Sequence, residues 1–324
     1  MKILVTGGAG FIGSYTCKAL LERGDDVVCI DNLNDYYNPK LKEHRLRQFE
    51  NNKNFKFYKE DLANVEKLKE IIELEKPEKI IHLAARAGVR ESVKYPLLYA
   101  EANIKALVAL LELSKNIKNF VFASTSAIYG DSKEIPFKES QQIGATQSFY
   151  AASKLAGENI CHYYSEVFNI PITCLRFFTV YGPSTRPDMA LFKFTHRIFH
   201  GKEIDAYGFG KLKRDFTYVT DVVAGILLAL DKNLKFEIIN LGNENPHEVN
   251  YLISLIEKNL GKKAIINYVP KPPGDVDITY ADTSKARNLL GYNPKVKIEE
   301  GVKNFVEWYV AEGSKFFPAD SIQK

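Results

Sequence analysis

Two side chains suited to proton transfer stand four residues apart in this sequence, at Tyr150 and Lys154. The apolar spacing of residues 148–167 predicts a helix, in which both side chains lie on one face. An ammonium group beside a phenol stabilises the phenolate and lowers the tyrosine pKa from about 10 towards neutrality. The pair is therefore a candidate general base, although this spacing is also common by chance.

Hydroxyl and guanidinium groups follow two other apolar segments. Ser124, Thr125 and Ser126 come directly after residues 119–123, which have the character of a buried strand. Side chains at the carboxyl end of such a strand suit hydrogen bonds to a polar substrate, but serine and threonine are also common in turns. Arginines follow residues 79–83 in the same way. They are expected near the same crevice unless they are ordinary surface residues, and they are Arg86 and Arg90.

The elements that must position these groups begin at the N-terminus. Residues 2–6 are apolar and branched, which is typical of a buried parallel strand. A glycine-rich turn follows, and from residue 11 the apolar residues take up helical spacing. Strand, turn and helix in this order bring backbone N–H groups and a helix N-terminus to a pyrophosphate. We expect this segment to bind a dinucleotide through Gly7, Gly10, Phe11, Ile12 and Gly13.

The second predicted strand, residues 26–30, ends in Asp31 and is followed by Asn32. A carboxylate about 20 residues beyond the glycine turn suits the two hydroxyl groups of an adenosine ribose. It would repel a 2′-phosphate, so the expected cofactor is NAD rather than NADP. Asn32 is included among the expected contacts.

Two further loops are expected to border the cofactor. The loop after the third predicted strand contains Asp61 and Leu62, both candidate adenine contacts. Asp61 would equally serve as the cap of the following helix. After the fourth predicted strand, small residues would let the backbone pass close to the cofactor phosphates or ribose. The candidates here are Leu83, Ala84 and Ala85.

Strands and helices alternate without interruption over the first 125 residues. This order predicts an α/β fold with a doubly wound parallel (Rossmann) sheet and helices on both faces. The length of 324 residues suits such a domain plus a smaller C-terminal substrate-binding lobe. We place the sheet domain at residues 1–180 with 215–242, and the lobe at 181–214 with 243–324.

Composition argues against several classes of partner. The 44 Lys and Arg residues against 40 Asp and Glu residues give a net charge of only +4, and the basic residues are scattered, so no nucleic acid is expected. No apolar run reaches transmembrane length, and the first strand begins too early for a signal peptide. We expect a cytoplasmic protein without membrane or metal partners. Its cysteines are expected to be buried and reduced: Cys17, Cys29, Cys161 and Cys174.

Together, the glycine turn, Asp31, the hydroxyl cluster and the Tyr150/Lys154 pair resemble the extended short-chain dehydrogenase/reductase family over nearly the whole chain. The motifs at residues 30–37, 87–90, 175–183 and 186–194 are similar to its UDP-glucuronate 4-epimerase branch. The resemblance implies that NAD is held by the glycine turn, Asp31, Asp61, Ala84, Asn103 and Lys154. It also implies a homodimer, built on helices at residues 97–114 and 148–167.

For the substrate, the resemblance implies a UDP-sugar whose 4-hydroxyl group lies between Thr125 and Tyr150. Arg214 would bind the diphosphate, and Asp275 belongs to a segment that covers the nucleotide. Ser126 and Thr179 would hold a sugar carboxylate by weak contacts. Its overall attraction would come from Arg186 or Arg90, of which Arg186 is preferred because it opens a branch-specific motif.

The implied reaction is C4 epimerisation, from UDP-glucuronate to UDP-galacturonate, through a 4-keto intermediate and transient NADH. The alternatives are a UDP-glucose or UDP-N-acetylhexosamine 4-epimerase. Decarboxylases of similar families carry Glu at the position of Ala127, and 4,6-dehydratases an Asp-Glu pair at Ser126 and Ala127, so both are disfavoured. A non-catalytic NAD-sensing scaffold is disfavoured because this chain keeps Tyr150 and Lys154.

Overall fold

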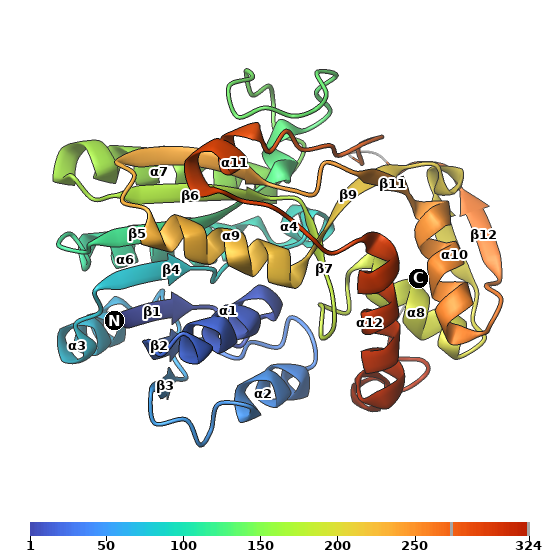
Figure 1. Cartoon of the computed structure of the whole chain (residues 1–324), viewed down its shortest axis with the longest axis horizontal. Helices are drawn as coiled ribbons and strands as arrows, with labels where there is room; N and C mark the ends of the chain where they lie inside the picture. Colours follow the sequence, from blue (N-terminus) through green and yellow to red (C-terminus); the bar gives the residue numbers. More distant parts are fainter. Residues whose placement is uncertain (273–274, 323–324) are drawn as a thin grey trace.

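The computed structural model describes residues 1–272 and 275–322. At its centre is a seven-stranded sheet of order β10-β6-β5-β4-β1-β2-β3, in which every neighbouring pair is parallel (Figure 1). The predicted doubly wound sheet is confirmed. Its strands are β1 Lys2–Thr6, β2 Asp26–Ile30, β3 Phe55–Tyr58, β4 Lys79–His82, β5 Asn119–Thr125, β6 Ile172–Phe177 and β10 Phe236–Leu241.

Both faces of the sheet are buried, because successive side chains of a strand point to opposite sides. In β1, Ile3 and Val5 belong to one apolar core and Leu4 to the other. The first core is covered by α1 Phe11–Glu22, α2 Pro39–Arg47, α9 Val219–Asp231 and α11 Ser284–Leu290. The second is covered by α3 Val65–Glu75, α6 Ala106–Glu112 and α7 Phe149–Phe168.

The single helix predicted at residues 97–114 is wrong in one respect. The structure divides it into α5 Pro96–Ala100, a π-helical turn Glu101–Lys105 and α6, after the short helix α4 Val89–Lys94. The N–H of Ala106 bonds to the carbonyl of Glu101, five residues back. Such π turns insert one extra residue and often occur at functional sites. Asn103 stands inside this turn.

The remaining elements form a lobe beside the sheet (Figure 1). It contains a three-stranded sheet, β11-β9-β7, and a two-stranded sheet, β12-β8. The apolar core of α1 continues into the lobe, where the Phe192, Phe305 and Tyr309 rings pack together. The lobe elements are β7 Thr179–Tyr181, α8 Ala190–Phe199, β8 Ile204–Tyr207, β9 Lys213–Tyr218, β11 Pro246–Glu248, α10 Val249–Leu260, β12 Ile266–Val269 and α12 Ile298–Ala311.

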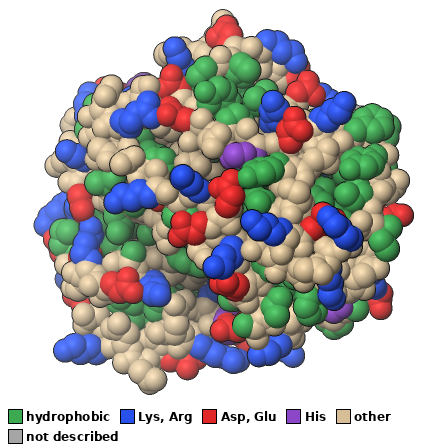
Figure 2. Space-filling model, turned by 45° about the vertical axis from the view of Figure 1, so that its right-hand side comes forward, with side chains coloured by type: hydrophobic (Ala, Val, Ile, Leu, Met, Phe, Trp, Pro, Cys, Tyr) green, Lys and Arg blue, Asp and Glu red, His purple; other side chains and the backbone are tan. Residues whose placement is uncertain are grey.

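The surface carries charges of both signs between apolar side chains, without a continuous patch of one sign on the face shown in Figure 2. This agrees with the low net charge of +4. Among the helices of the described residues, none has the length and apolar character needed to cross a bilayer. All four cysteines are buried and unpaired, as predicted.

Candidate functional site

The predicted site residues converge on one edge of the sheet, where the parallel strands end. The glycine turn after β1 packs so closely that side chains do not fit. A Cβ on Gly7, whose φ is +73°, would lie 2.7 Å from the backbone nitrogen of Ala84. One on Gly13 would lie 2.1 Å from the carbonyl oxygen of Gly7, so α1 packs against the turn itself. The backbone N–H of Gly10 continues the turn by donating a hydrogen bond to the Gly7 carbonyl, at 2.9 Å. Phe11 and Ile12 open α1 beside this turn.

Asp31 lies at the end of β2, beside the glycine turn. Its carboxylate accepts hydrogen bonds from the backbone N–H groups of Ala9 at 3.2 Å and Leu33 at 2.9 Å. Burial raises the pKa of Asp31, while the nearby Lys42 ammonium and these hydrogen bonds act in the opposite direction. The acid is thus fixed against the turn, as a ribose contact requires.

The alternative roles of Asp61 are resolved by the neighbouring contacts. Asn64 caps α3 by accepting from the backbone of Lys67, whereas Asp61 accepts a hydrogen bond from the Asn32 amide at 2.7 Å. Asn32 and Asp61 therefore join the loops after β2 and β3 at the predicted adenine side. The Leu62 side chain is buried in the apolar core, which disfavours its predicted contact with adenine.

The loop after β4 is anchored on both sides. The backbone N–H groups of Leu83 and Ala84 donate to the Thr6 carbonyl and hydroxyl, at 3.1 and 3.3 Å. Asn103 accepts from the Arg86 N–H at 2.8 Å and donates to the Arg86 carbonyl and the Ser153 hydroxyl. Its amide is thus used to hold this loop, which includes Ala85, against α7. The π turn is what aims Asn103 at the loop.

The Tyr150/Lys154 pair lies at the beginning of α7, which Ser148 caps at 3.1 Å. The Lys154 ammonium is buried, donates to the Ala123 carbonyl at 2.8 Å and lies over the Phe122 ring. Burial lowers the pKa of Lys154 to about 8. The helix therefore presents both side chains to the end of β5, as the spacing predicts.

The predicted lowering of the Tyr150 pKa by Lys154 is wrong for this structure. Burial raises the pKa of Tyr150, and the groups that oppose this rise are the Arg186 guanidinium and a hydrogen bond with Thr125. The physical reason is that Lys154 directs its ammonium to a β5 carbonyl. The positive charge that acts on the phenol comes instead from the loop after β7.

Arg186 is held in a fixed orientation. Its Nε and Nη2 atoms donate to the two carboxylate oxygens of Asp188, at 2.9 and 2.7 Å. Although burial lowers it, the pKa of Arg186 is raised by this carboxylate and by the nearby Tyr36 and Tyr150 hydroxyls. Arg186 is thus a permanently charged group beside the candidate base.

Arg90 lies farther towards the lobe, with its guanidinium 4.8 Å from the centre of the Tyr207 ring on β8. Ser126 begins a single turn of 3-10 helix after β5, and Thr179 begins β7. Among the described residues, neither the Ser126 nor the Thr179 hydroxyl has a hydrogen-bond partner, so both remain open to a substrate.

Arg214 and Asp275, predicted separately as substrate contacts, bind each other. The Arg214 guanidinium donates to the Asp275 carboxylate at 2.5 Å, which joins β9 to the segment predicted to cover the nucleotide. Burial lowers the pKa of Arg214, opposed by Asp275. Pro273 and Gly274 of the covering segment lie outside the described residues.

Two buried networks were not predicted from the sequence. Arg45 on α2 donates to the Ala9 carbonyl, the Tyr37 hydroxyl and the Ser184 carbonyl, at 3.1, 2.6 and 2.6 Å. A helical arginine is normally read as a surface residue, so only its position after Asp31 hinted at this role. Behind the site, Arg176 on β6 forms a buried two-contact ion pair with Glu158, one turn after Lys154 on α7.

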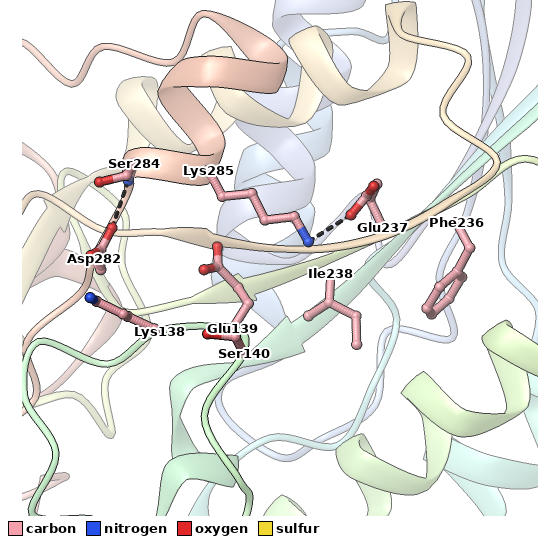
Figure 3. A pocket seen from close by; sticks show the side chains of 9 residues that line it. All are labelled: Lys138, Glu139, Ser140, Phe236, Glu237, Ile238, Asp282, Ser284 and Lys285. Atoms are coloured by element: carbon pink, nitrogen blue, oxygen red, sulfur yellow. Dashed lines mark hydrogen bonds and ion pairs between the residues drawn. The ribbon is translucent and has the colours of Figure 1, made fainter.

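A separate hollow of about 580 Å³ opens at the edge strand β10 (Figure 3). Its carboxylates are engaged with a lysine or with backbone N–H groups, as in the Lys285–Glu237 ion pair at 2.6 Å and the hydrogen bond from the Ser284 N–H to Asp282 at 2.9 Å. In the sheet, β6 separates β10 from β5, which carries Thr125. The hollow is therefore not part of the candidate site.

A glycine turn, an acid after β2 and a Tyr–Lys pair after β5 on a doubly wound sheet define the extended short-chain dehydrogenase/reductase class. Within it, this chain belongs to the family described as GDP-mannose 4,6-dehydratase, whose family model matches residues 4–305. The predicted membership of the extended short-chain dehydrogenase/reductase family is confirmed.

Individual proteins that are similar to this chain include several UDP-sugar 4-epimerases. A UDP-glucuronate 4-epimerase of Thermodesulfobacterium geofontis is 44% identical over 94% of this chain and 95% of its own. Among solved structures, the UDP-glucuronic acid 4-epimerase of Bacillus cereus with UDP-glucuronic acid and NAD has a TM-score of 0.91 at 38% identity, covering 96% and 99% of the two chains. The UDP-glucose 4-epimerase of Thermotoga maritima with UDP-glucose has a TM-score of 0.88 at 36% identity, with coverages of 96% and 99%.

Proposed function

We propose that this protein is an NAD-dependent UDP-glucuronate 4-epimerase. The observation that carries the proposal is the position of Tyr150, which lies at the start of α7 near Thr125 and a permanently charged arginine. A base with a neighbouring cation suits a sugar that bears both a 4-hydroxyl group and a carboxylate. The related enzymes described above support this choice of sugar.

The residues around the glycine turn fit NAD. Gly7 and Gly13 let the turn pack closely against Ala84 and the start of α1, which brings the N-terminus of that helix to the end of β1, where it suits a phosphate. Asp31 stands at the ribose side of the turn. Lys154 and Ala84 complete the set that would hold the cofactor. NAD, when bound, supplies the hydride acceptor and donor at the sugar C4.

The protein supplies positioning and proton transfer. Tyr150 would accept the proton of the sugar 4-hydroxyl group, with Thr125 holding the same hydroxyl group in place, and would return the proton to the epimeric product. Positive charge from Arg186 and the Thr125 hydrogen bond favour the phenolate that this step needs. Between the two transfers the 4-keto sugar turns its other face to the cofactor.

The carboxylate of the sugar would be attracted by Arg186. This residue is preferred over Arg90, because the Arg90 guanidinium lies over the Tyr207 ring in the lobe, whereas the charge of Arg186 opposes the rise in the pKa of Tyr150. The Ser126 and Thr179 hydroxyls would fix the carboxylate by neutral hydrogen bonds. In such a site the bond from C5 to the carboxylate need not be aligned for loss of CO2.

For the diphosphate, the proposal assigns Arg214 and Asp275 to the same region of the substrate. A planar guanidinium suits a diphosphate, and its present partner Asp275 would be exchanged for phosphate oxygens. Arg214 is thus available as a preformed but neutralised anion site.

Two other reactions start from the same 4-keto sugar. Decarboxylation and 4,6-dehydration are disfavoured because Ser126 and Ala127 stand where similar families with these activities carry acids. Epimerisation of UDP-glucose remains the second candidate, favoured by the Thermotoga maritima structure. It is ranked lower because a neutral sugar offers no carboxylate to the Arg186 guanidinium.

A direct test offers the purified protein a panel of UDP-sugars and follows the products by NMR. We expect UDP-glucuronate and UDP-galacturonate to interconvert without net consumption of NAD. Formation of a UDP-pentose with CO2 would instead identify a decarboxylase. Faster conversion of UDP-glucose or a UDP-N-acetylhexosamine would replace the proposed substrate.

We further propose a homodimer and a cytoplasmic location. Large apolar side chains of α4, α5 and α7 are exposed, namely Val93, Leu97, Tyr163 and Val167, with exposed fractions of 70%, 82%, 55% and 53%. Burial of such a surface against a second copy would remove it from water. A monomeric mass by light scattering at micromolar concentration would reject the dimer. The location rests on four unpaired cysteines.

A further inference from the structure

Tyr36 links two loops that are far apart in the sequence. It belongs to the loop after β2, which begins at the ribose-facing Asp31. Its hydroxyl donates to the Asp188 carboxylate at 3.4 Å, although 152 residues separate the two. Asp188 in turn holds Arg186. A side chain on the cofactor side of the crevice is therefore connected to the group beside the candidate base.

Asp188 determines which nitrogens of the Arg186 guanidinium remain available to a ligand. Asp188 occupies the edge of the guanidinium formed by Nε and Nη2. Among the residues that the structure describes, no group accepts a hydrogen bond from Nη1. Nη2 also lies 3.8 Å from the Met189 sulfur, a weak acceptor. Asp188 thus fixes one edge of the guanidinium and leaves Nη1, on the other edge, for an anion.

The position of Tyr36 is itself tightly defined. A Cβ on Gly88, whose φ is +106°, would lie 2.5 Å from the Tyr36 hydroxyl oxygen. The Tyr36 backbone N–H donates to the Asn34 side chain at 3.2 Å. Burial raises the pKa of Tyr36, so its hydroxyl keeps the proton that it donates to Asp188.

A second connection holds the same two loops in register. The neighbouring Tyr37 hydroxyl accepts a hydrogen bond from Arg45, whose other nitrogens bind the carbonyl and hydroxyl of Ser184, two residues before Arg186. Arg45 is 2% exposed, so this bridge is buried. Buried hydrogen bonds therefore join the two loops, and Tyr36 reaches Arg186 through Asp188.

We propose that Tyr36 and Asp188 are positioning residues that set the preference for an anionic sugar by aiming the free edge of Arg186 at the sugar carboxylate. This rests on the proposed function, in which Arg186 attracts a uronate. Charge alone would give the opposite expectation for Asp188, because its carboxylate neutralises Arg186 and should weaken anion binding. Orientation and charge can thus be separated by experiment.

The test measures binding of UDP-glucuronate and UDP-glucose to the NAD-loaded protein by calorimetry, in a Tyr150→Phe background that prevents turnover. Tyr36→Phe changes no charge and should weaken UDP-glucuronate about threefold to tenfold, with little change for UDP-glucose. Asp188→Asn should weaken the binding of UDP-glucuronate by at least the same factor. The double variant should bind UDP-glucuronate little more weakly than Asp188→Asn alone, because Tyr36 acts through Asp188.

Tyr15→Phe is the matched control. Its hydroxyl donates to the carbonyl of Pro183 in the same loop at 3.1 Å, but does not contact Asp188. The Kd ratio of the two sugars should stay unchanged in this variant. An equal loss in Tyr15→Phe, or tighter UDP-glucuronate binding by Asp188→Asn, would overturn the positioning role.

The proposed function is tested separately, by epimerisation with the unmodified protein. An active epimerase with an unchanged Kd ratio in Tyr36→Phe would overturn the positioning role alone. A changed ratio in a protein without epimerase activity would support the positioning role and overturn the proposed reaction.

Discussion

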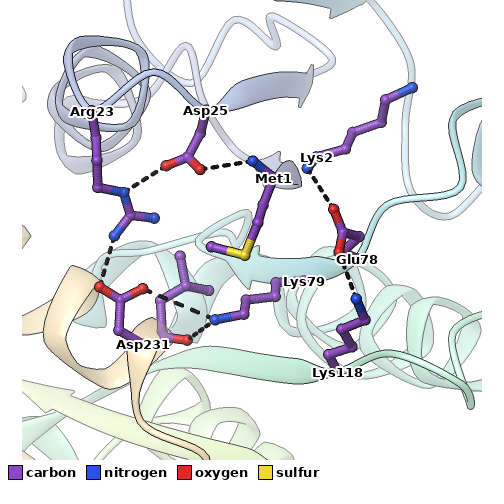
Figure 4. A network of polar contacts seen from close by, with 9 residues as sticks. Met1, Lys2, Arg23, Asp25, Glu78, Lys79, Lys118 and Asp231 are labelled. Atoms are coloured by element: carbon purple, nitrogen blue, oxygen red, sulfur yellow. Dashed lines mark hydrogen bonds and ion pairs between the residues drawn. The ribbon is translucent and has the colours of Figure 1, made fainter.

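Charged side chains are arranged differently at the two edges of the central sheet, where the parallel strands begin and where they end. At the edge where the strands begin, charges are neutralised in pairs (Figure 4). The amino group of Met1 lies 3.1 Å from Asp25, and Arg23 bridges Asp25 and Asp231 at 2.6 and 2.8 Å. Lys118 lies 2.6 Å from Glu78. These pairs connect the ends of helices and strands and leave little charge for a ligand.

At the edge where the strands end, positive charge is in excess. Arg186 and Arg214 each have a carboxylate partner, but five other cations around the site have none within 4.0 Å among the described residues. They bind carbonyl or hydroxyl groups or lie over aromatic rings, and they are Lys42, Arg45, Arg86, Arg90 and Lys154. Cations without neutralising partners prepare a crevice for anions, such as a pyrophosphate and a nucleotide sugar. One edge therefore stabilises the fold, and the other keeps positive charge for ligands.

Removal of the candidate base should give the largest effect. Tyr150→Phe deletes one hydroxyl group at the ligand edge and should lower turnover of UDP-glucuronate on the order of 10²- to 10⁴-fold, because general base catalysis is lost. Bound NAD should be retained, as measured by absorbance of the denatured protein. Tyr268→Phe, on an exposed strand of the lobe, is the control and should keep full activity. Near-normal turnover by Tyr150→Phe would sink the assignment of the base.

Low pH should destabilise the protein through His82, which lies at the edge where the strands end. His82, at the end of β4, is buried and bonded to the Thr6 hydroxyl at 2.7 Å, and burial lowers its pKa to about 3. An unfolded histidine has a pKa of about 6.5. Between these values only the unfolded chain binds the proton. The free energy of unfolding should therefore fall as the pH drops from 6.5 towards 3, by several kcal/mol in total, at about 1.4 kcal/mol per pH unit.

Urea unfolding at pH 7 and pH 5 would measure this dependence. His82→Phe should be less stable at pH 7, because the Thr6 hydroxyl loses its partner, but its stability should change less with pH. An equally steep dependence in this variant would assign the acid sensitivity to other groups.

Loss of Arg186 should have an intermediate and selective effect. A charge-assisted hydrogen bond contributes about 1.5–3 kcal/mol, so Arg186→Ala should raise the KM for UDP-glucuronate on the order of 10- to 100-fold. The KM for UDP-glucose should barely change, whereas kcat should fall with both sugars because Arg186 also favours the Tyr150 phenolate. Arg90→Ala provides the comparison and should affect UDP-glucuronate less. An equal rise in KM for both sugars would show that Arg186 is structural or binds phosphate.

The smallest effect is expected at the opposite edge. Arg23→Ala removes two ion pairs, but Asp231 is 51% exposed, so solvent screens that pair, and the buried Asp25 keeps the Met1 amino group as its partner. The free energy of unfolding should fall by no more than about 1 kcal/mol. Turnover should stay within about twofold of the unmodified protein, since the comparison assigns this edge to the fold. A large loss of turnover in a folded Arg23→Ala variant would contradict the division between the edges.

Local sequence patterns determined the main parts of this protein. The sheet, the family and the position of the glycine turn follow from the order of strand, turn and helix, because each depends on neighbouring residues. Asp31 follows β2 directly, and Tyr150 and Lys154 share a helix face through their spacing. Such features are set by backbone geometry over a few residues.

Only the tertiary structure decided which groups meet across the crevice. Arg45 reaches Ser184, 139 residues away, and the π turn aims Asn103 at the Arg86 backbone. Lys154 turns to a β5 carbonyl, so the charge that acts on Tyr150 comes from Arg186, a residue of another loop. These contacts depend on how separate loops pack at the end of the sheet, and that packing is not encoded in the spacing of any single segment.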